Sequence, residues 1–424
     1  MFLKFISIPD FDFQTSYKNG IYKIKSLSLF DKIFTIFWLL GPFVFLIERD
    51  PADFWLSFIG LVFLIRSFIV KDWSWANQTW FKLALILWLI SLISALANNN
   101  TLFSLKEGFV WIRFPIYAVA AQAWLARDKD IRTVMLSSMF FGVIIMCIIL
   151  ILELIIDPKP RLEWPYNDTM TGAYLTKVSL PLFCVMCAIA GSRINFTSIF
   201  YGLTSILTIA MSFLTGERVS FVIKIFSGFL SGLNWKPKLF PYIFFTFILM
   251  FCLSSIMILR PDLGTRYTKT FFNNIPMINT HDNNPYWGSW RSGIQQITIT
   301  PILGIGPSGS RKTCLELPPK EPAWLPGKNY CGNHPHNFYI QLFSETGIFG
   351  LMIGTLMFIS IIKSCYKVKL DNPTCPISAT AFIIPLSLFF PLQQFGSFFG
   401  QWGNLFIWFA VGFAISQVKL RTKD

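Results

Sequence analysis

The run VMLSSMFFGVIIMCIILILELII, residues 134–156, decides the fold because it is apolar along nearly its whole length. It is long enough to cross the hydrocarbon core of a bilayer, which takes about 20 residues of helix. Backbone groups in hydrocarbon must pair within the segment, so the run forms a helix. It does not alternate apolar and polar residues as a barrel strand would. We therefore predict a transmembrane helix here.

Similar runs recur along the 424-residue chain, which is 54% hydrophobic and only 14% charged. Soluble domains carry about 25% charged residues, so lipid is the main solvent of this chain. We predict an all-α polytopic membrane protein with about twelve transmembrane helices, folded as a single transmembrane domain over residues 1–424. The predicted spans are 32–48, 53–70, 80–97, 107–125, 134–156, 174–191, 196–214, 219–233, 240–259, 338–362, 376–393 and 401–418.

Lys and Arg side chains give the chain a net charge of +14, and their distribution predicts its orientation. They concentrate in the segments that face the cytoplasm if residues 1–31 form a cytoplasmic N-terminal segment. Both termini are then cytoplasmic. Basic residues that flank helices on this side favour contact with anionic membrane lipid, so we expect a membrane partner and no nucleic acid.

The segment 260–337, between the ninth and tenth predicted spans, is the one long break in hydrophobicity. It is too long for a passive connector, and we predict an outer loop that caps the bundle. Helix-like stretches lie near 285–300 and near 334–340, on either side of the Gly/Pro-rich turn 301–309. Cys314 and Cys331 both fall in this loop, where an oxidising compartment favours a disulfide, with two free thiols as the alternative.

Two arginines lie where the predicted spans meet the outer surface. Arg218 is part of Thr215-Gly-Glu-Arg-Val-Ser220, and its planar guanidinium suits phosphate oxygens. A snorkelling side chain paired with Glu217 is the alternative. Arg291 is part of Trp287-Gly-Ser-Trp-Arg-Ser292, which suits a phosphate or a sugar face. Here the alternative is an interfacial aromatic anchor.

A looser set of outer cations comprises Arg113 in the fourth span, Arg161 after the fifth and Lys177 at the start of the sixth. Arg113 must face the bundle interior or a water-filled cavity, because a charge facing lipid is costly. For Arg161 and Lys177 the alternative is a solvated loop charge. We expect the three cations to help bind an anionic substrate.

The segment Asn333-His-Pro-His-Asn-Phe338 places two of the three histidines at the entry to the tenth span. Histidine is the usual general base near neutral pH, so His336 and its neighbour His334 are candidates for proton transfer. Asn337 and Glu345 are suited to orient a substrate or the imidazole. A His-x-His pair also suits a metal, but no further cluster completes a tetrahedral site, and we expect no metal and no cofactor.

Several cations and a histidine thus gather at one membrane face beneath a polar cap. The ligand that they imply is anionic, and a diphosphate head group on a lipid fits best. Cations stabilise the charge that develops as a phosphate leaves. The histidine would take the proton from an attacking hydroxyl group.

The segment around His336 resembles the O-antigen ligase and polymerase superfamily of bacterial membrane glycosyltransferases. That family shows a histidine, a polar residue, nine residues, a glycine, two residues and a small residue. Here the pattern reads His336-Asn337, residues 338–346, Gly347, residues 348–349 and Gly350. Three further elements occur in family order over roughly residues 165–350: Asn167…Thr171-Gly172, Thr215-Gly-Glu-Arg218, and Arg291…Pro301-Ile-Leu-Gly-Ile-Gly-Pro307.

The resemblance implies a glycosyltransferase C-like fold and a metal-independent, inverting transfer from an undecaprenyl diphosphate-linked glycan. In ligases the acceptor is lipid A–core, in lipopolysaccharide biosynthesis. Carried over, Arg218 and Arg291 bind the donor diphosphate, and His336 acts as base or orients the acceptor hydroxyl. The site would face the periplasm from the bacterial inner membrane, with 260–337 as a periplasmic cap.

The single large outer loop favours an O-antigen ligase among the related activities. An O-antigen polymerase often has two sizeable outer loops. A protein O-oligosaccharyltransferase tends to carry an extra C-terminal outer domain, whereas this chain stops six residues after its last predicted span. A non-enzymatic transporter of lipid-linked sugars is the alternative from another class. Transporters commonly show internal repeats and charges near the midplane, and here we find no repeat.

Overall fold

The computed structural model describes residues 12–98, 101–268, 285–316, 327–332, 334–391 and 396–420, and within these ranges it is helical with no strand. The all-α prediction is confirmed. The helices of the first half are α1 (Phe13–Ser26), α2 (Leu29–Leu39), α3 (Gly41–Ile47), α4 (Arg49–Val70), η1 (Ser74–Asn77), α5 (Thr79–Leu96), α6 (Thr101–Trp111), α7 (Arg113–Ala120), the π-helical turn η2 (Ala121–Leu125), α8 (Lys129–Ile156), α9 (Thr171–Ala190) and α10 (Phe196–Leu214).

The second half continues the helical bundle. Its helices are α11 (Arg218–Asn234), α12 (Leu239–Leu259), α13 (Pro261–Tyr267), α15 (Pro285–Ile299), α16 (Ser310–Leu315), α17 (Phe338–Asp371), α18 (Pro376–Thr380), α19 (Ile383–Leu388) and α20 (Gln401–Ile415).

Fewer helices than the predicted twelve are long and apolar enough to cross a membrane. Among the described residues there are seven, namely α4, α5, α8, α9, α10, α12 and α17, or eight if α2 and α3, bent by 49°, form one span. The other predicted spans are helical but short or broken. The segment 107–125 divides among α6, α7 and η2, the described part of 376–393 divides into α18 and α19, and α11 and α20 have 17 and 15 residues.

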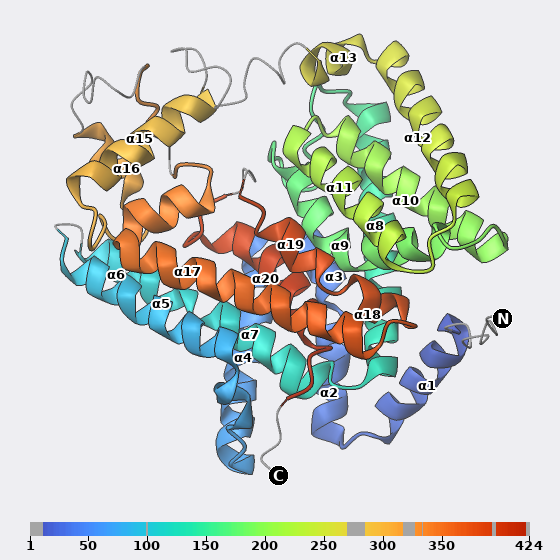
Figure 1. The fold of residues 1–424 in the computed structure, drawn as a ribbon, viewed down its shortest axis with the longest axis horizontal. Helices are drawn as coiled ribbons and strands as arrows, with labels where there is room; N and C mark the ends of the chain where they lie inside the picture. Colours follow the sequence, from blue (N-terminus) through green and yellow to red (C-terminus); the bar gives the residue numbers. More distant parts are fainter. Residues whose placement is uncertain are drawn as a thin grey trace, which may run out of the picture.

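Helix α9 forms the centre of the bundle and α12 lies at its edge. In the apolar window of α9, 94% of the residues are buried, compared with 6% in α12. Helices α8, α10, α11 and α20 pack around α9, while α12 packs on α10 and, through Tyr242, on α11 (Figure 1). The exposed apolar surface of α12 is therefore the surface of a helix that faces lipid.

The described part of the outer loop gathers at one side of the bundle. Helices α13, α15 and α16 lie there, away from α1, α2 and the C-terminal end (Figure 1). Helix α15 confirms the helix-like stretch near 285–300. The stretch near 334–340 begins later than predicted, because Asn337 caps α17: its Oδ1 accepts hydrogen bonds from the backbone N of Tyr339 (2.9 Å) and Ile340 (3.2 Å).

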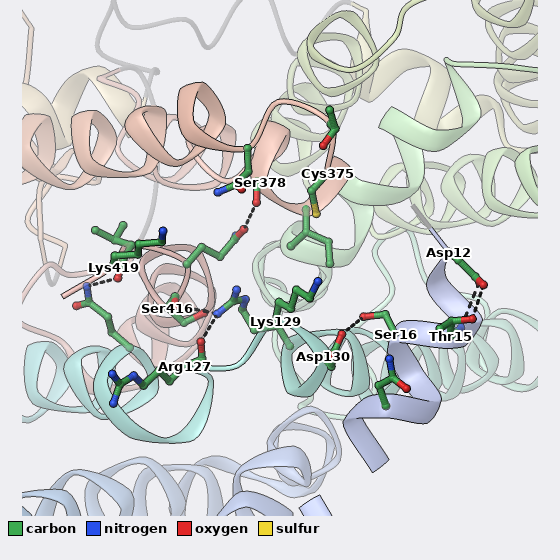
Figure 2. A pocket seen from close by; sticks show the side chains of 18 of the residues that line it. Asp12, Thr15, Ser16, Arg127, Lys129, Asp130, Cys375, Ser378, Ser416 and Lys419 are labelled. Carbon is green, nitrogen blue, oxygen red and sulfur yellow. Dashed lines mark hydrogen bonds between the residues drawn. The ribbon is translucent and has the colours of Figure 1, made fainter. Parts of the chain in front are cut away.

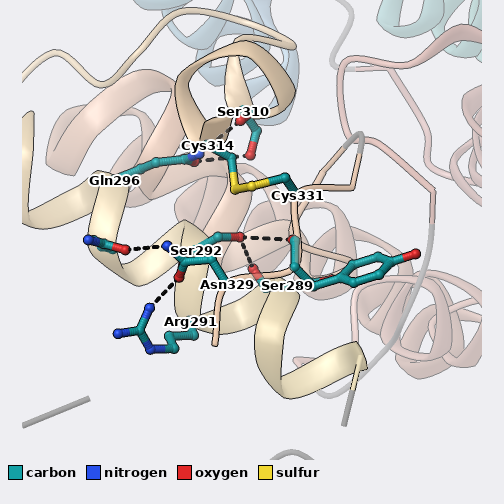
Figure 3. The surroundings of a disulfide bond; sticks show 10 residues. Ser289, Arg291, Ser292, Gln296, Ser310, Cys314, Asn329 and Cys331 are labelled. Atoms are coloured by element: carbon teal, nitrogen blue, oxygen red, sulfur yellow. Dashed lines mark hydrogen bonds between the residues drawn. A yellow bond between two sulfur atoms is a disulfide. The ribbon is translucent and has the colours of Figure 1, made fainter. Parts of the chain in front are cut away.

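A disulfide joins Cys314 at the end of α16 to Cys331, which confirms the predicted bridge (Figure 3). Side chains reinforce the same connection. The Gln296 Nε2 donates to the Ser310 carbonyl (2.9 Å), and the Ser310 hydroxyl donates to Gln296 Oε1 (3.0 Å). Helices α15 and α16 and the segment 327–332 therefore form one braced unit.

Removing this disulfide is expected to lower thermal stability. Cys314 and Cys331 are 17 residues apart, and a loop of that size contributes about 3 kcal/mol through the restricted unfolded chain. The double variant Cys314→Ser/Cys331→Ser should therefore melt at a lower temperature in detergent, and reductant should lower the melting temperature of the parent but not of the double variant. Cys252→Ser, which changes a free cysteine on α12, is the control. Equal melting of parent and double variant would contradict the prediction.

Candidate functional site

The site is built around the turn between α10 and α11. Residues Thr215, Gly216 and Glu217 make this turn, and Arg218 is the first residue of α11. Gly216 has φ +66°, a conformation that costs a glycine little. A Cβ on Gly172 would lie 2.1 Å from Thr215 Oγ1, so the start of α9 packs directly on the turn. Two of the sequence elements that resemble the superfamily, Asn167…Thr171-Gly172 and Thr215-Gly-Glu-Arg218, thus meet.

A cluster of guanidinium groups surrounds this turn. Arg161 pairs with Glu217 at 2.9 Å, and Arg266 of α13 donates from Nε to the Gly216 carbonyl at 2.8 Å. Arg218 is only 7% exposed. Burial raises the pKa of the Glu217 carboxyl, and Arg161, Arg266 and Arg218 oppose that rise. We call Arg161, Arg218 and Arg266 the cation cluster; three positive charges gathered around this turn attract anions.

Tyr286 of α15 connects the cation cluster to the histidine segment. The Arg218 Cζ lies 5.9 Å from the centroid of the Tyr286 ring. The His336 ring lies 6.1 Å from the same ring, edge-on at 82°, and the His334 ring lies 4.2 Å from that of His336. The structure thus brings together the predicted Arg218 and His336, in what we call the Arg218–Tyr286–His336 stack.

Arg291 lies on the same helix as Tyr286 but is held inside the cap. It is 1% exposed, and its Nη1 donates to Asn329 Oδ1 (Figure 3). Asn329 in turn donates to Gln295 Oε1 at 2.7 Å. A Cβ on Gly293 would lie 2.9 Å from the ring of Pro335, so α15 packs closely on the segment between the two histidines. Arg291 therefore ties α15 to the segment 327–332, and Gly293 lets α15 approach Pro335.

Glu345 holds the Gly-rich turn 301–309 in place. Its carboxylate, fully buried, accepts hydrogen bonds from the backbone N of Ser308 (2.9 Å) and from Gln341 Nε2 (3.0 Å). Its carbonyl accepts from the backbone N of Gly306 (3.0 Å). The same carbonyl accepts from the Ser94 hydroxyl of α5 (2.7 Å), so Glu345 joins the turn, its own helix and α5.

Residues 203–354 match the model of a family described as O-antigen ligase. The match covers a little over a third of the chain, and we call these residues the matched segment. The match supports the O-antigen ligase and polymerase superfamily that the motifs predicted, and with it a ligase- or polymerase-type function in glycan assembly. The matched segment contains all three members of the stack, together with Arg291 and Glu345. A search of curated proteins found no match.

A kink in α17 shapes the matched segment beside the histidines. Gly347 has φ +68° and ψ −171° inside the helix. The backbone N of Ile348 donates to the Pro301 carbonyl (2.9 Å), so the kink pairs with the Gly-rich turn. Gly350 and Gly354 leave space for Thr346 and Leu342 of the same helix. These two glycines therefore allow close packing within α17 next to the bend at Gly347.

Gly347→Ala is expected to destabilise the protein at the kink in α17. A Cβ there would lie 1.9 Å from the Ile302 carbonyl oxygen, and the positive φ adds strain of roughly 1–3 kcal/mol. Gly396→Ala is the control, because a Cβ at Gly396 meets nothing within 4 Å. Thermal unfolding in detergent should show a lower midpoint for the first variant only. An unchanged midpoint for Gly347→Ala would show that the kink is dispensable.

Three other predicted site residues, Asn337, Arg113 and Lys177, make contacts within the helical bundle. Asn337 caps α17, and its Nδ2 donates to the Pro391 carbonyl at 2.7 Å. Arg113 pairs with Asp53 of α4 at 2.6 Å and donates to Ser57 at 3.1 Å, so its described contacts are away from the cation cluster. Lys177 is 1% exposed and lies 5.8 Å from the Tyr174 ring centroid, in the part of α9 that reaches the α10–α11 turn.

Sequence reasoning did not select Arg266 and Tyr286, which the structure adds to the site. Both lie in the predicted outer loop within the matched segment, where charged and aromatic side chains are common. The available signal was the position of Arg266 just after a predicted span, at the same membrane face as Arg218. Among the residues that the structure describes, no group of three or more His, Cys, Asp or Glu side chains could hold a metal ion.

Proposed function

We propose that this chain is an O-antigen ligase that transfers a glycan from undecaprenyl diphosphate to lipid A–core at the periplasmic face of the bacterial inner membrane. The observation that carries the proposal is the Arg218–Tyr286–His336 stack. It sets a guanidinium group suited to phosphate and an imidazole suited to proton transfer on one aromatic ring. In this proposal both termini lie in the cytoplasm.

The donor diphosphate would bind at the cation cluster. Arg161 and Arg266 fix the turn that presents Arg218, through Glu217 and the Gly216 carbonyl respectively. Lys177 would add a buried positive charge from α9. Arg291 supports the site indirectly by fixing the helix that carries Tyr286. Such a preorganised set of cations stabilises the negative charge that grows on the diphosphate as it leaves.

The reaction would be an inverting, metal-independent displacement. The acceptor hydroxyl oxygen attacks the anomeric carbon of the donor, the bond from that carbon to the diphosphate oxygen breaks, and undecaprenyl diphosphate leaves with the electron pair. His336 takes the hydroxyl proton, and His334 beside it would help to set the position of the ring. The arginines then bind the leaving group, while His336 activates the acceptor.

The test is transfer by the purified protein given an undecaprenyl diphosphate glycan, with and without lipid A–core. Glycan on lipid A–core is the expected product. Longer glycans on the polyprenyl carrier would make the chain a polymerase, and glycan on a protein acceptor would make it a protein transferase. Movement of the intact donor across vesicles without any covalent product would instead favour a transporter.

A further inference from the structure

A large polar cavity lies at the end of the bundle away from α13, α15 and α16. Its volume is about 730 Å³, and α1, the start of α8, the segment 372–378 and the segment 416–420 line it (Figure 2). Under the proposed orientation this end faces the cytoplasm. Four basic and two acidic side chains line it: Arg127, Lys129, Arg132, Lys419, Asp12 and Asp130.

Both carboxylates of the cavity already have partners. Asp130 pairs with Lys23 at 2.7 Å and accepts a hydrogen bond from the Ser16 hydroxyl at 2.7 Å. Asp12 caps α1, accepting from the backbone N of Gln14 at 2.9 Å and from Thr15 (Figure 2). Asp130 therefore holds α1 against α8 and is paired with a cation, while Asp12 caps α1.

The four basic side chains have no such neutralising partner within the part of the chain that the structure describes, where none forms an ion pair with a carboxylate. Arg132 donates to the carbonyls of Ala126 (2.7 Å) and Ser416 (3.1 Å), which fixes its charge between α8 and α20. Arg127, Lys129 and Lys419 are exposed. The cavity thus offers positive charge to an anion.

An apolar groove lies along the same two helices. It has a volume of about 150 Å³ and is lined by Phe13 of α1, by Ser137, Phe140 and Phe141 of α8, and by side chains of α9 and α10. Ser137 follows Asp130 by about two helical turns, so both fall on one face of α8. The basic cavity and the apolar groove follow one another along α8. A ligand with an anionic head group and an apolar tail fits both.

We infer that the cavity binds the head group of an anionic phospholipid from the cytoplasmic leaflet. Its phosphate would lie against Arg127, Lys129 and Lys419, and one acyl chain would follow the apolar groove on α8. The shared chemistry is a phosphate group, and the groove assigns it to a lipid rather than to a soluble phosphate. This site is separate from the proposed transfer site, at the other end of the bundle.

The test is native mass spectrometry of the full chain in detergent, titrated separately with phosphatidylglycerol, phosphatidylcholine and glycerol phosphate. The variant Arg127→Gln/Lys129→Gln/Lys419→Gln removes the exposed cations of the cavity. The control Lys25→Gln/Lys363→Gln/Lys367→Gln removes the same charge from exposed residues outside it. Equal thermal midpoints of both variants and the parent show that folding is intact.

The parent and the control should bind phosphatidylglycerol equally, and the cavity variant should bind it roughly 100-fold more weakly, about fivefold for each cation lost. Phosphatidylcholine and glycerol phosphate should bind much more weakly to all three. Equal binding of phosphatidylcholine, or an equal loss in the control variant, would overturn the site. Glycerol phosphate that binds as tightly as phosphatidylglycerol would overturn the assignment to a lipid.

Discussion

Replacing His336 by alanine is expected to lower the rate of glycan transfer roughly 10²–10⁴-fold, the usual contribution of a general base. The ring of His336 packs edge-on against Tyr286, and Arg218 contacts the same Tyr286 ring. In the proposed mechanism the imidazole therefore lies where donor and acceptor would meet. The variant lacks the group that takes the acceptor proton. The measurement is the initial rate of transfer at saturating donor.

His334→Ala is the matched control for this prediction. It removes the neighbouring ring, 4.2 Å from that of His336, and should reduce the rate much less. Its effect should come through the position of His336. A larger loss in His334→Ala than in His336→Ala would mean that the two histidines have been assigned the wrong way round.

Arg218→Ala is expected to lower transfer roughly 10²–10³-fold, because it removes a donor aimed at the charge on the leaving diphosphate. Arg218→Lys should recover only part of this loss, since an ammonium group cannot form the two parallel hydrogen bonds of a guanidinium group. The measurement is kcat/KM for the donor at a fixed acceptor concentration.

Arg260→Ala serves as the control for Arg218. Arg260 also lies at this end of the bundle, just before α13, but it pairs with the exposed carboxylate of Asp262 at 2.8 Å and donates to the Lys159 carbonyl at 2.8 Å. Surface ion pairs contribute about 0–1 kcal/mol, so this variant should transfer glycan like the parent. Similar losses in Arg218→Ala and Arg260→Ala would indicate a general effect of outer charge rather than a specific diphosphate site.

The fold was predictable where hydrophobicity alone determines structure. Runs such as 134–156 are helices because lipid leaves the backbone no other partner. The number of crossing helices was not predictable to the same degree, because apolar runs do not reveal breaks. The run 107–125 is interrupted at Arg113, which pairs with Asp53 of α4, and that ion pair depends on tertiary packing.

The site was partly predictable, because each candidate was selected by its chemistry and by its place at the outer face. These criteria selected Arg218 and His336, which the structure brings to one ring. They did not select Tyr286, because nothing in a sequence shows which aromatic residue lies between two distant segments. Glu345 is the opposite case. It was selected as a group that orients a substrate or the imidazole, but its buried carboxylate holds a backbone turn.

Donor binding measured apart from transfer tests the proposed mechanism most directly, because Arg218 and His336 have different roles in it. Undecaprenyl diphosphate binding would be titrated on the parent, Arg218→Ala and His336→Ala in detergent. Arg218→Ala should lose most of its affinity, while His336→Ala should bind like the parent yet transfer almost no glycan. Normal binding by Arg218→Ala, or lost binding by His336→Ala, would contradict the mechanism.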